Sequence, residues 1–187
     1  DERARDDVLR SDARYDKPHS DKNENRILSA QNFVIATGTR PAVPKIEGID
    51  SVPYFTNETI FDQLNERPES LVVLGGGPIG CELGQTFNRL GVRTTIVQRG
   101  AHFLPREDVD VSDFLEKRLK DEGVSVFTNA EAKSVARDNG GIKMSILHKD
   151  AGATQIYASA LLICSGRRPN IDNLGLDIAG VNTNERG

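Results

Sequence analysis

Cysteine is scarce in this sequence, whose 187 residues contain only Cys81 and Cys164, and tryptophan is absent. Two cysteines so far apart cannot form a C-x-x-C pair, a zinc-binding spacing or a disulfide framework. Each lies in an apolar stretch, the first on an expected helix and the second at the end of an expected strand. We therefore predict two buried structural thiols, no metal site, and a reducing compartment, the cytoplasm.

Long apolar runs and an excess of positive charge are also missing. No stretch approaches the roughly 20 apolar residues that cross a bilayer, so no membrane partner is expected. The net charge is −4, whereas a protein that binds nucleic acid presents a basic surface. We therefore expect no nucleic-acid partner either, and the ordinary balance of apolar and charged residues is typical of a globular protein.

The middle of the chain alternates between strand-like and helix-like patterns. Short β-branched runs predict strands at 71–75, 93–97 and 124–127, and apolar residues at helical spacing predict helices at 78–90 and 109–122. The short connections between these elements predict a parallel sheet with right-handed crossovers.

Each of the two helices is expected to bury one apolar face and to end at a glycine, Gly91 and Gly123 respectively. The expected inward residues are Ile79, Leu83, Phe87 and Leu90 in the first helix and Val111, Leu115 and Leu119 in the second.

Three further strand-like segments follow, at 132–136, 142–148 and 154–158. Turn-rich residues separate them, which predicts an antiparallel meander. The apolar run 160–166 then predicts a buried strand that returns to the parallel sheet. The predicted fold class is α/β: a Rossmann-like βαβαβ parallel sheet with an antiparallel three-stranded meander.

The segments before this region show weaker patterns. The first 26 residues are densely charged, and we expect them to lie on the surface or to be poorly ordered. Residues 33–37 predict a short buried strand, and the proline-rich residues 39–50 predict an extended linker. Residues 57–66 predict a short helix that ends before Pro68.

A glycine-rich turn joins the strand at 71–75 to the helix that follows. Gly75, Gly77 and Gly80 match the spacing G-x-G-x-x-G in this strand–turn–helix context. Gly75 permits a tight turn, and Gly77 lets the backbone approach a diphosphate. Gly80 and Gly84 let the helix pack closely on the strands, and Pro78 suits the first helical position. Because a helix N-terminus attracts phosphate, the turn predicts a dinucleotide-binding site.

The residues after the second strand predict which dinucleotide binds. An NAD-binding site would carry an acidic residue here, about 20 positions after the glycines. This chain instead has Gln98, which does not repel a 2′-phosphate, followed by Arg99, which can bind one. Arg106 is a second candidate. NADPH is therefore preferred over NADH, although surface arginines without a ligand are the alternative for both positions.

Three stretches carry a family resemblance by their order and spacing: VIATGTRPAVPKIEGI, LVVLGGGPIGCELGQTFNRLG and LLICSGRRPN. The first resembles the segment that leaves the FAD domain in the pyridine nucleotide–disulfide oxidoreductases, the flavoprotein family of glutathione reductase, dihydrolipoamide dehydrogenase and mercuric reductase. The second resembles the NAD(P) fingerprint of that family, and the third the segment that re-enters the FAD domain. The stretch FLPREDVDVSDFLEKRLKDEGV is most similar to mercuric reductase-like members.

This resemblance implies an enzyme in which NADPH, or alternatively NADH, reduces FAD. The FAD then reduces a cysteine pair, which passes electrons to a disulfide, a metal ion such as Hg(II), or another acceptor. The resemblance also implies site residues. Pro78 and Ile79 resemble residues that flank the nicotinamide, and Glu82 resembles an acid that pairs with a lysine beside the flavin, an ordinary surface carboxylate being the alternative. The remaining residues resemble contacts to FAD (Thr37, Gly38, Arg167) and a backbone contact close to the nucleotide (Gly166).

The redox cysteine pair, the FAD fingerprint and the dimerisation domain of the family have no counterpart in this sequence, so no catalytic residue is assigned. We expect a remnant of the FAD domain and a linker at 1–48, an NAD(P)-binding domain at 49–166, and the start of the return to the FAD domain at 167–187. The missing domains would be its partners, in a full-length homodimer. The alternatives are an isolated nucleotide-binding module without activity and an NADH-linked parent similar to dihydrolipoamide dehydrogenase.

Overall fold

A computed structural model describes residues 12–17, 20–23, 26–184 and 187 of the chain. The chain divides into two compact units, which are described separately. The sheet unit comprises residues 41–167, and the terminal unit comprises the residues up to 40 together with those from 168 onward.

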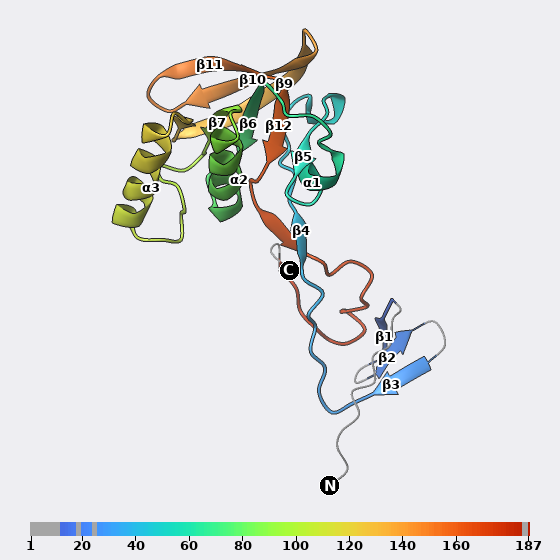
Figure 1. The fold of residues 1–187 in the computed structure, drawn as a ribbon. Helices are drawn as coiled ribbons and strands as arrows, with labels where there is room; N and C mark the ends of the chain where they lie inside the picture. Colours follow the sequence, from blue (N-terminus) through green and yellow to red (C-terminus); the bar gives the residue numbers. More distant parts are fainter. Residues whose placement is uncertain (1–11, 18–19, 24–25, 185–186) are drawn as a thin grey trace. The chain divides into compact units, whose positions relative to one another are not determined.

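The sheet unit is built around five parallel strands in the order β5-β12-β6-β7-β8 (Figure 1). The strands are β5 (Phe55–Thr56), β6 (Ser70–Leu74), β7 (Arg93–Val97), β8 (Ser125–Phe127) and β12 (Ala160–Ile163). Strand β6 continues through a helix to β7 on one side, and β12 returns to its other side. This arrangement confirms the α/β fold with a parallel sheet.

Helices cover one face of the parallel sheet and an antiparallel meander covers the other (Figure 1). The helices are α1 (Ile60–Gln63), α2 (Pro78–Arg89) and α3 (Val109–Asp121). The meander has the strand order β11-β10-β9 and consists of β9 (Ala130–Asp138), β10 (Gly141–His148) and β11 (Gly152–Ala158). The predicted three-stranded meander is therefore confirmed.

Two apolar cores result from the alternation of side chains along the central strands. In β6, Val72 and Leu74 pack toward the meander, whereas Leu71 and Val73 pack toward the helices. All four are buried. Because successive residues of a strand point to opposite faces, such a strand has to be apolar on both sides.

The helix faces agree with the expected ones only in part. In α2, Leu83 and Phe87 pack against the core on the helix side, as predicted. Helix α2 buries Gly80, Cys81 and Gly84, while Leu90, just beyond its end, is 60% exposed. Its backbone approaches the sheet so closely that a Cβ on Gly84 would lie 2.8 Å from Cδ1 of Ile96. Small residues therefore occupy the positions that lie closest to the sheet.

The expected face of α3 is also wrong in part. Val111 is 46% exposed, and the neighbouring Ser112 is buried in its place. The Ser112 hydroxyl donates a hydrogen bond to the Phe103 carbonyl at 2.6 Å, which allows a polar residue to be buried. Leu119 is buried as predicted. Gly91 and Gly123 end the two helices with positive φ, as predicted.

Two predictions for the start of the sheet unit need correction. The helix expected at 57–66 is confined to α1, because a turn precedes it in which the Thr56 amide donates to Oγ1 of Thr59. The expected linker at 39–50 is only partly extended. Ile46 and Ile49 are buried in the core on the meander side, so this segment is packed rather than free.

The terminal unit contains a second antiparallel sheet, in the order β1-β2-β3. Its strands are β1 (Arg14–Lys17), β2 (Ser20–Asn23) and β3 (Arg26–Ser29), none of which the charged sequence predicts. Residues 1–11, which were also expected to lie on the surface or to be poorly ordered, lie outside the described residues. Farther along the chain, β4 (Thr39–Pro41) pairs with β13 (Arg167–Pro169) in a two-stranded sheet.

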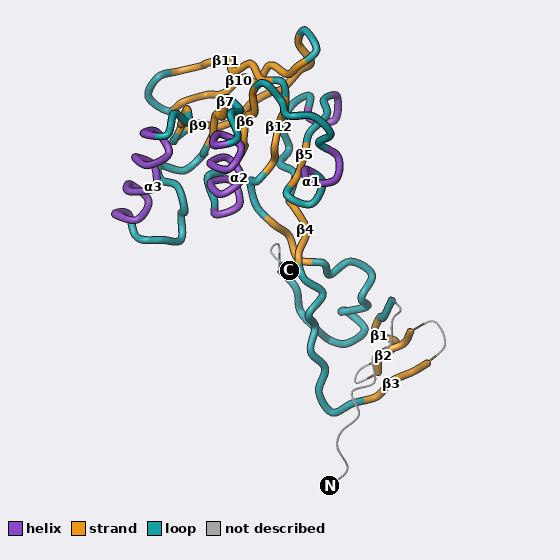
Figure 2. Tube along the Cα trace, in the orientation of Figure 1, coloured by secondary structure: helices purple, strands orange, loops and turns teal. Residues whose placement is uncertain are grey.

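The buried strand expected at 33–37 is wrong. The segment is a loop in Figure 2, and Val34 is 90% exposed. Among the described residues no strand pairs with it, and a β-strand needs a neighbour to bond its backbone groups. Instead, Thr37 exchanges hydrogen bonds with Asn170, its hydroxyl donating to the Asn170 carbonyl and its carbonyl accepting from the Asn170 side chain.

Candidate nucleotide-binding site

The candidate site lies where the parallel strands end. The glycine turn, residues 75–78, connects β6 to α2, Gln98 follows β7, and Cys164 follows β12. The chain passes from β6 to β7 on one side of β6, and it later returns to β12 on the other side of β6. The edge where these strands end is therefore the topological switch point of the sheet. Ligands of open α/β sheets bind at such a point.

Gly75 and Gly80 are required by close backbone contacts. Gly75 has a φ of 116°, and a Cβ there would lie 2.4 Å from the Cys164 carbonyl oxygen. A Cβ on Gly80 would lie 1.9 Å from the Gly75 carbonyl oxygen. These two glycines therefore shape the turn and seat the helix upon it, whether or not a ligand is present.

Gly77 has a different environment. Its φ is −76°, which any residue adopts, and apart from its own chain neighbours no described atom lies within 4 Å of the position of its missing Cβ. Contacts inside the protein thus give no reason for a glycine here. A ligand that approaches the backbone at this point would supply one, as a diphosphate does in dinucleotide sites.

Three backbone amides at the start of α2 fit the same ligand. Within the described part of the chain, the N–H groups of Gly77, Ile79 and Gly80 donate to no protein acceptor. Gly80 is itself buried, and buried amides normally have a partner. Pro78 lacks an N–H and lies at the first helical position. Unpaired amides and the positive end of the helix dipole together suit an anionic group.

The loop after β7, residues 98–108, folds back onto the glycine turn. Gln98 accepts a hydrogen bond from the Gly76 amide at 3.0 Å and donates one to the His102 carbonyl at 3.1 Å. The Leu104 amide donates to the Gly76 carbonyl at 2.8 Å. The predicted site residue Gln98 thus lies beside the turn, with both ends of its amide group bonded to the protein.

Both arginines predicted to bind a 2′-phosphate are exposed, and they lie in this loop. Neither Arg99 nor Arg106 forms a hydrogen bond or close ion pair with any described residue. Arg99 does lie near Glu131, whose pKa is lowered chiefly by Lys133 and to a smaller extent by the Arg99 charge. Arg99 is therefore free to bind an anion, with Glu131 as a weak competitor.

The start of α2 carries two groups of different character. Glu82 is exposed on the helix. Cys81 is buried, and its thiol lies 3.5 Å from the Gly76 carbonyl oxygen as a weak donor. Burial, with a smaller contribution from Glu82, raises the pKa of Cys81 to about 12. Cys164 is half-buried rather than buried as predicted. Partial burial still raises its pKa to about 12, so both thiols are protonated at neutral pH.

The residues that resemble flavin contacts (Thr37, Gly38 and Arg167) are divided between the two units, and Gly166, which resembles a contact close to the nucleotide, lies in the sheet unit. In the sheet unit, Arg167 donates to the side chain of Asn57 at 3.2 Å and lies 3.4 Å from Glu58, and the Gly166 carbonyl accepts from Ala42 at 3.0 Å. In the terminal unit, the hydroxyl of Thr37 and the carbonyl of Gly38 both bond to Asn170. The structure brings the residues of the glycine turn and Gln98 together within the sheet unit, whereas Thr37 and Gly38 belong to the terminal unit.

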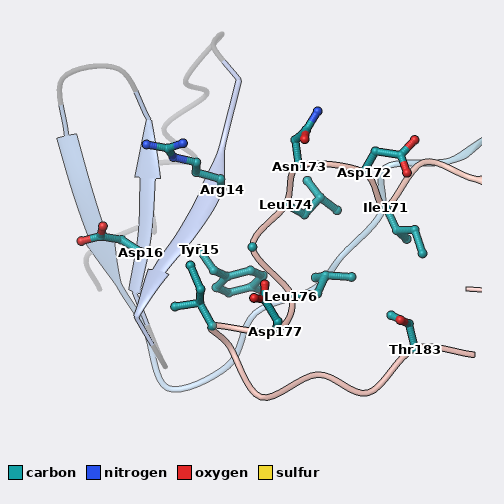
Figure 3. Close-up of a pocket in the computed structure, with 12 residues that line it drawn as sticks. Arg14, Tyr15, Asp16, Ile171, Asp172, Asn173, Leu174, Leu176, Asp177 and Thr183 are labelled. Atoms are coloured by element: carbon teal, nitrogen blue, oxygen red, sulfur yellow. The ribbon is translucent and has the colours of Figure 1, made fainter.

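A hollow of about 630 Å³ in the terminal unit was not predicted from the sequence (Figure 3). Tyr15 of β1 and residues 171–178 line it. The Tyr15 amide donates to the Leu174 carbonyl at 2.8 Å, and the Tyr15 ring packs edge-on against Phe33.

No group of three His, Cys, Asp or Glu side chains in the described residues is arranged to hold a metal ion. None of the described helices has the length and apolar content of a bilayer-crossing segment.

The comparisons with known proteins agree on one family. A family model described as pyridine nucleotide-disulphide oxidoreductase matches residues 2–187. A mercuric reductase of Streptomyces lividans is 41% identical over 160 residues, which are 86% of this chain and 33% of the relative. A mercuric reductase of Lysinibacillus sphaericus is 34% identical over 177 residues, or 95% of this chain and 32% of the relative.

A solved structure gives the same result. The Cu(II) complex of the HOCl-induced flavoprotein disulfide reductase RclA from Escherichia coli superimposes with a TM-score of 0.81 at 33% identity. The match covers 97% of this chain and 40% of the RclA chain. The chain thus spans about a third of the length of the curated relatives it matches.

Proposed function

This chain belongs to the pyridine nucleotide-disulphide oxidoreductase family, and from that membership we propose that it binds the nicotinamide dinucleotide of a FAD-dependent oxidoreductase. One observation carries the proposal: three unpaired amides lie at Gly77 and in the two residues after Pro78, and Gly77 itself has no structural explanation as a glycine. In such an enzyme, the nicotinamide supplies a hydride and the flavin accepts it. The part of this chain is to bind and orient the dinucleotide, and we assign that role to the sheet unit, close to the expected domain at 49–166.

The diphosphate would lie against the amides of Gly77, Ile79 and Gly80. These donors are fixed by the helix, so they need no rearrangement to bind an anion. Pro78 and Ile79 lie at the start of the same helix, where the resemblance places the nicotinamide. Glu82 lies farther along this helix, and its proposed role is to pair with a lysine beside the flavin.

We further propose that the preferred nucleotide is NADPH. Arg99 and Arg106 are exposed cations without a bonded partner among the described residues, and they follow the strand end that normally contacts the adenine ribose. Gln98 adds no negative charge. An NADH-linked parent similar to dihydrolipoamide dehydrogenase is the alternative, and it predicts that both nucleotides bind equally or that NADH binds more tightly.

For the complete protein we propose a cytoplasmic homodimer that passes electrons from NADPH through FAD to a disulfide or a metal-ion acceptor. The mercuric reductases among its relatives support this acceptor class. The chain alone is proposed to bind the nucleotide without catalysing the reaction, because it contains no cysteine pair at the redox spacing.

The test is a titration of the 187-residue chain with NADPH and with NADH, followed by the fluorescence of the reduced nicotinamide. Gly77→Ala should weaken the binding of both nucleotides at least about tenfold, because the new methyl group would occupy the diphosphate position. Its unfolding transition should match that of the wild type, since the methyl group meets no protein atom. Unchanged binding in Gly77→Ala contradicts the site.

Arg99→Ala tests the choice of nucleotide. It should raise the Kd for NADPH by about tenfold, the loss of one charge-assisted hydrogen bond, and leave the Kd for NADH unchanged. Arg93→Ala is the matched control, because Arg93 opens the same strand, pairs with Glu69 on the surface and lies at the opposite end from the site. An equal loss for both nucleotides in Arg99→Ala would refute its role in binding the 2′-phosphate.

A further inference from the structure

Gly76 is not one of the three glycines of the G-x-G-x-x-G spacing, yet the structure leaves no room for another residue. A Cβ at this position would lie 2.1 Å from Cδ1 of Phe103. Phe103 is fully buried and belongs to the loop after β7. The contact therefore joins the middle of the glycine turn to a residue 27 positions later in the sequence.

The same loop also takes both backbone hydrogen-bonding groups of Gly76. The Gly76 amide donates to Oε1 of Gln98 at 3.0 Å, and the Gly76 carbonyl accepts from the Leu104 amide at 2.8 Å. The other end of the Gln98 amide donates to the His102 carbonyl at 3.1 Å. The Gln98 side chain thus links Gly76 of the glycine turn to His102, four residues farther along the loop.

Further bonds fix the loop from outside. The Gly100 carbonyl accepts from the Asn129 amide at 2.9 Å, and the Phe103 carbonyl accepts from the buried Ser112 hydroxyl at 2.6 Å. Arg99 and Arg106 are exposed on a loop whose backbone is held at several points between them. Their distance from the glycine turn is consequently set by the bonds of Gln98 and Leu104.

We propose that Gln98 is a specificity-determining positioning residue: its carboxamide holds the arginine-bearing loop on the glycine turn, so that the diphosphate and the 2′-phosphate of NADPH meet one rigid surface. This inference rests on the proposed function and deepens it. The role requires a group that accepts at one end and donates at the other. A carboxylate at position 98 could still accept from Gly76, but its second oxygen would face the His102 carbonyl oxygen without a proton between them.

A fixed loop favours NADPH over NADH because the two nucleotides differ only in the 2′-phosphate. If the loop were loose, ordering Arg99 and Arg106 would have to occur during binding and would weaken the binding of NADPH. NADH makes no use of these two residues. Release of the loop therefore reduces the preference for NADPH and leaves the binding of NADH nearly unchanged.

The experiment compares Gln98→Met and Gln98→Glu with the wild-type 187-residue chain. Methionine keeps the length of the side chain and removes both hydrogen bonds without adding charge. Gln155→Glu is the matched control for the charge change, because Gln155 is exposed on the outer strand β11. Two readouts are taken: the Kd values for NADPH and NADH, and the hydrogen-exchange rates of the Gly76 and Leu104 amides by NMR.

We expect Gln98→Met to lower the ratio of the NADH Kd to the NADPH Kd by about fivefold, because only part of the loss of the two loop hydrogen bonds is felt in nucleotide binding. It should also accelerate exchange at Gly76 and Leu104. Gln98→Glu should lower the ratio further, and Gln155→Glu should change neither readout. A wild-type ratio in Gln98→Met overturns the specificity role, and unchanged exchange overturns the attachment of the loop. If the wild type binds neither nucleotide, the proposed function fails and the specificity role with it, while the exchange rates still decide whether Gln98 holds the loop.

Discussion

Gly80 lies against Gly75 so closely that a Cβ on Gly80 would stand 1.9 Å from the Gly75 carbonyl oxygen. Both residues are buried, and backbone atoms cannot turn aside as a flexible side chain can. The first turn of α2 is therefore seated directly on the glycine turn. The N-terminus of the helix and its unpaired amides can therefore hold this position only because residue 80 has no side chain.

Gly80→Ala should lower the free energy of unfolding by about 2 kcal/mol, because overpacking in a closed site exceeds the gain in helix propensity. Gly77→Ala is the matched comparison in the same turn and should change the stability by less than about 0.5 kcal/mol, since its methyl group meets no protein atom. Urea unfolding followed by far-UV circular dichroism measures both. Equal stability of the two variants would contradict the packing described here.

Gly76→Ala should be destabilising for a different reason, because its Cβ would overlap the ring of the buried Phe103. Phe103→Ala removes the overlapping ring atoms and leaves a cavity. The double variant should therefore be more stable than the sum of the two single changes predicts, by at least about 0.5 kcal/mol. Urea unfolding of the four proteins gives this coupling energy, and strict additivity would show that Phe103 does not constrain Gly76.

The parallel sheet and the meander could be predicted because their patterns are local. Each central strand is a short apolar run, and turn residues separate the meander strands. The buried faces of the helices were harder to predict, because close backbone contacts place Gly80 and Gly84 at the inward positions, where apolar spacing gives no signal. Ser112 is buried because of a hydrogen bond to Phe103, a partner that no helical periodicity indicates.

The terminal unit and the role of Gln98 depend on contacts between distant residues. Residues 33–37 have the composition of a strand, but the described residues offer them no strand to pair with. The charged strands β1–β3 form by pairing with one another. For Gln98, the sequence gives its place after β7, whereas its bonds to Gly76 and His102 exist only because the loop folds back.

The two cysteines should resist alkylation in the folded chain. Cys81 is 4% exposed, and burial raises the pKa of Cys81 and of Cys164 from 9.0 to about 12. At pH 8 both thiols are therefore protonated, whereas iodoacetamide reacts with the thiolate. Cys81 is also buried and Cys164 is half-buried. Mass spectrometry should find both unmodified after a time that labels the chain completely in concentrated urea. Equal labelling of the folded and unfolded chains would contradict this burial.

Glu122, at the end of α3, joins the two long helices. Its carboxylate accepts hydrogen bonds from Arg89 at 2.7 and 2.8 Å, from Arg118 at 2.6 Å, and from the Gln85 side chain at 3.1 and 3.2 Å. The side chain is only 14% exposed. These bonds, led by the one from Arg89, lower the pKa of Glu122 from 4.5 to about 2. The carboxylate therefore stays ionised in the folded chain at pH values where it is protonated in the unfolded chain.

This difference fixes the sign of the pH dependence. A group whose pKa is lower in the folded state stabilises the fold above its unfolded pKa, and that contribution is lost as the pH falls from about 4.5 to about 2. Glu122→Gln should therefore lower the stability at pH 7 and reduce the loss of stability across this acidic range. Glu69→Gln is the control, because Glu69 pairs with Arg93 while 80% exposed, and such surface pairs contribute little. Urea midpoints measured from pH 7 down to pH 2 test this, and an unchanged acidic slope in Glu122→Gln would show that α2 and α3 are not joined through this carboxylate.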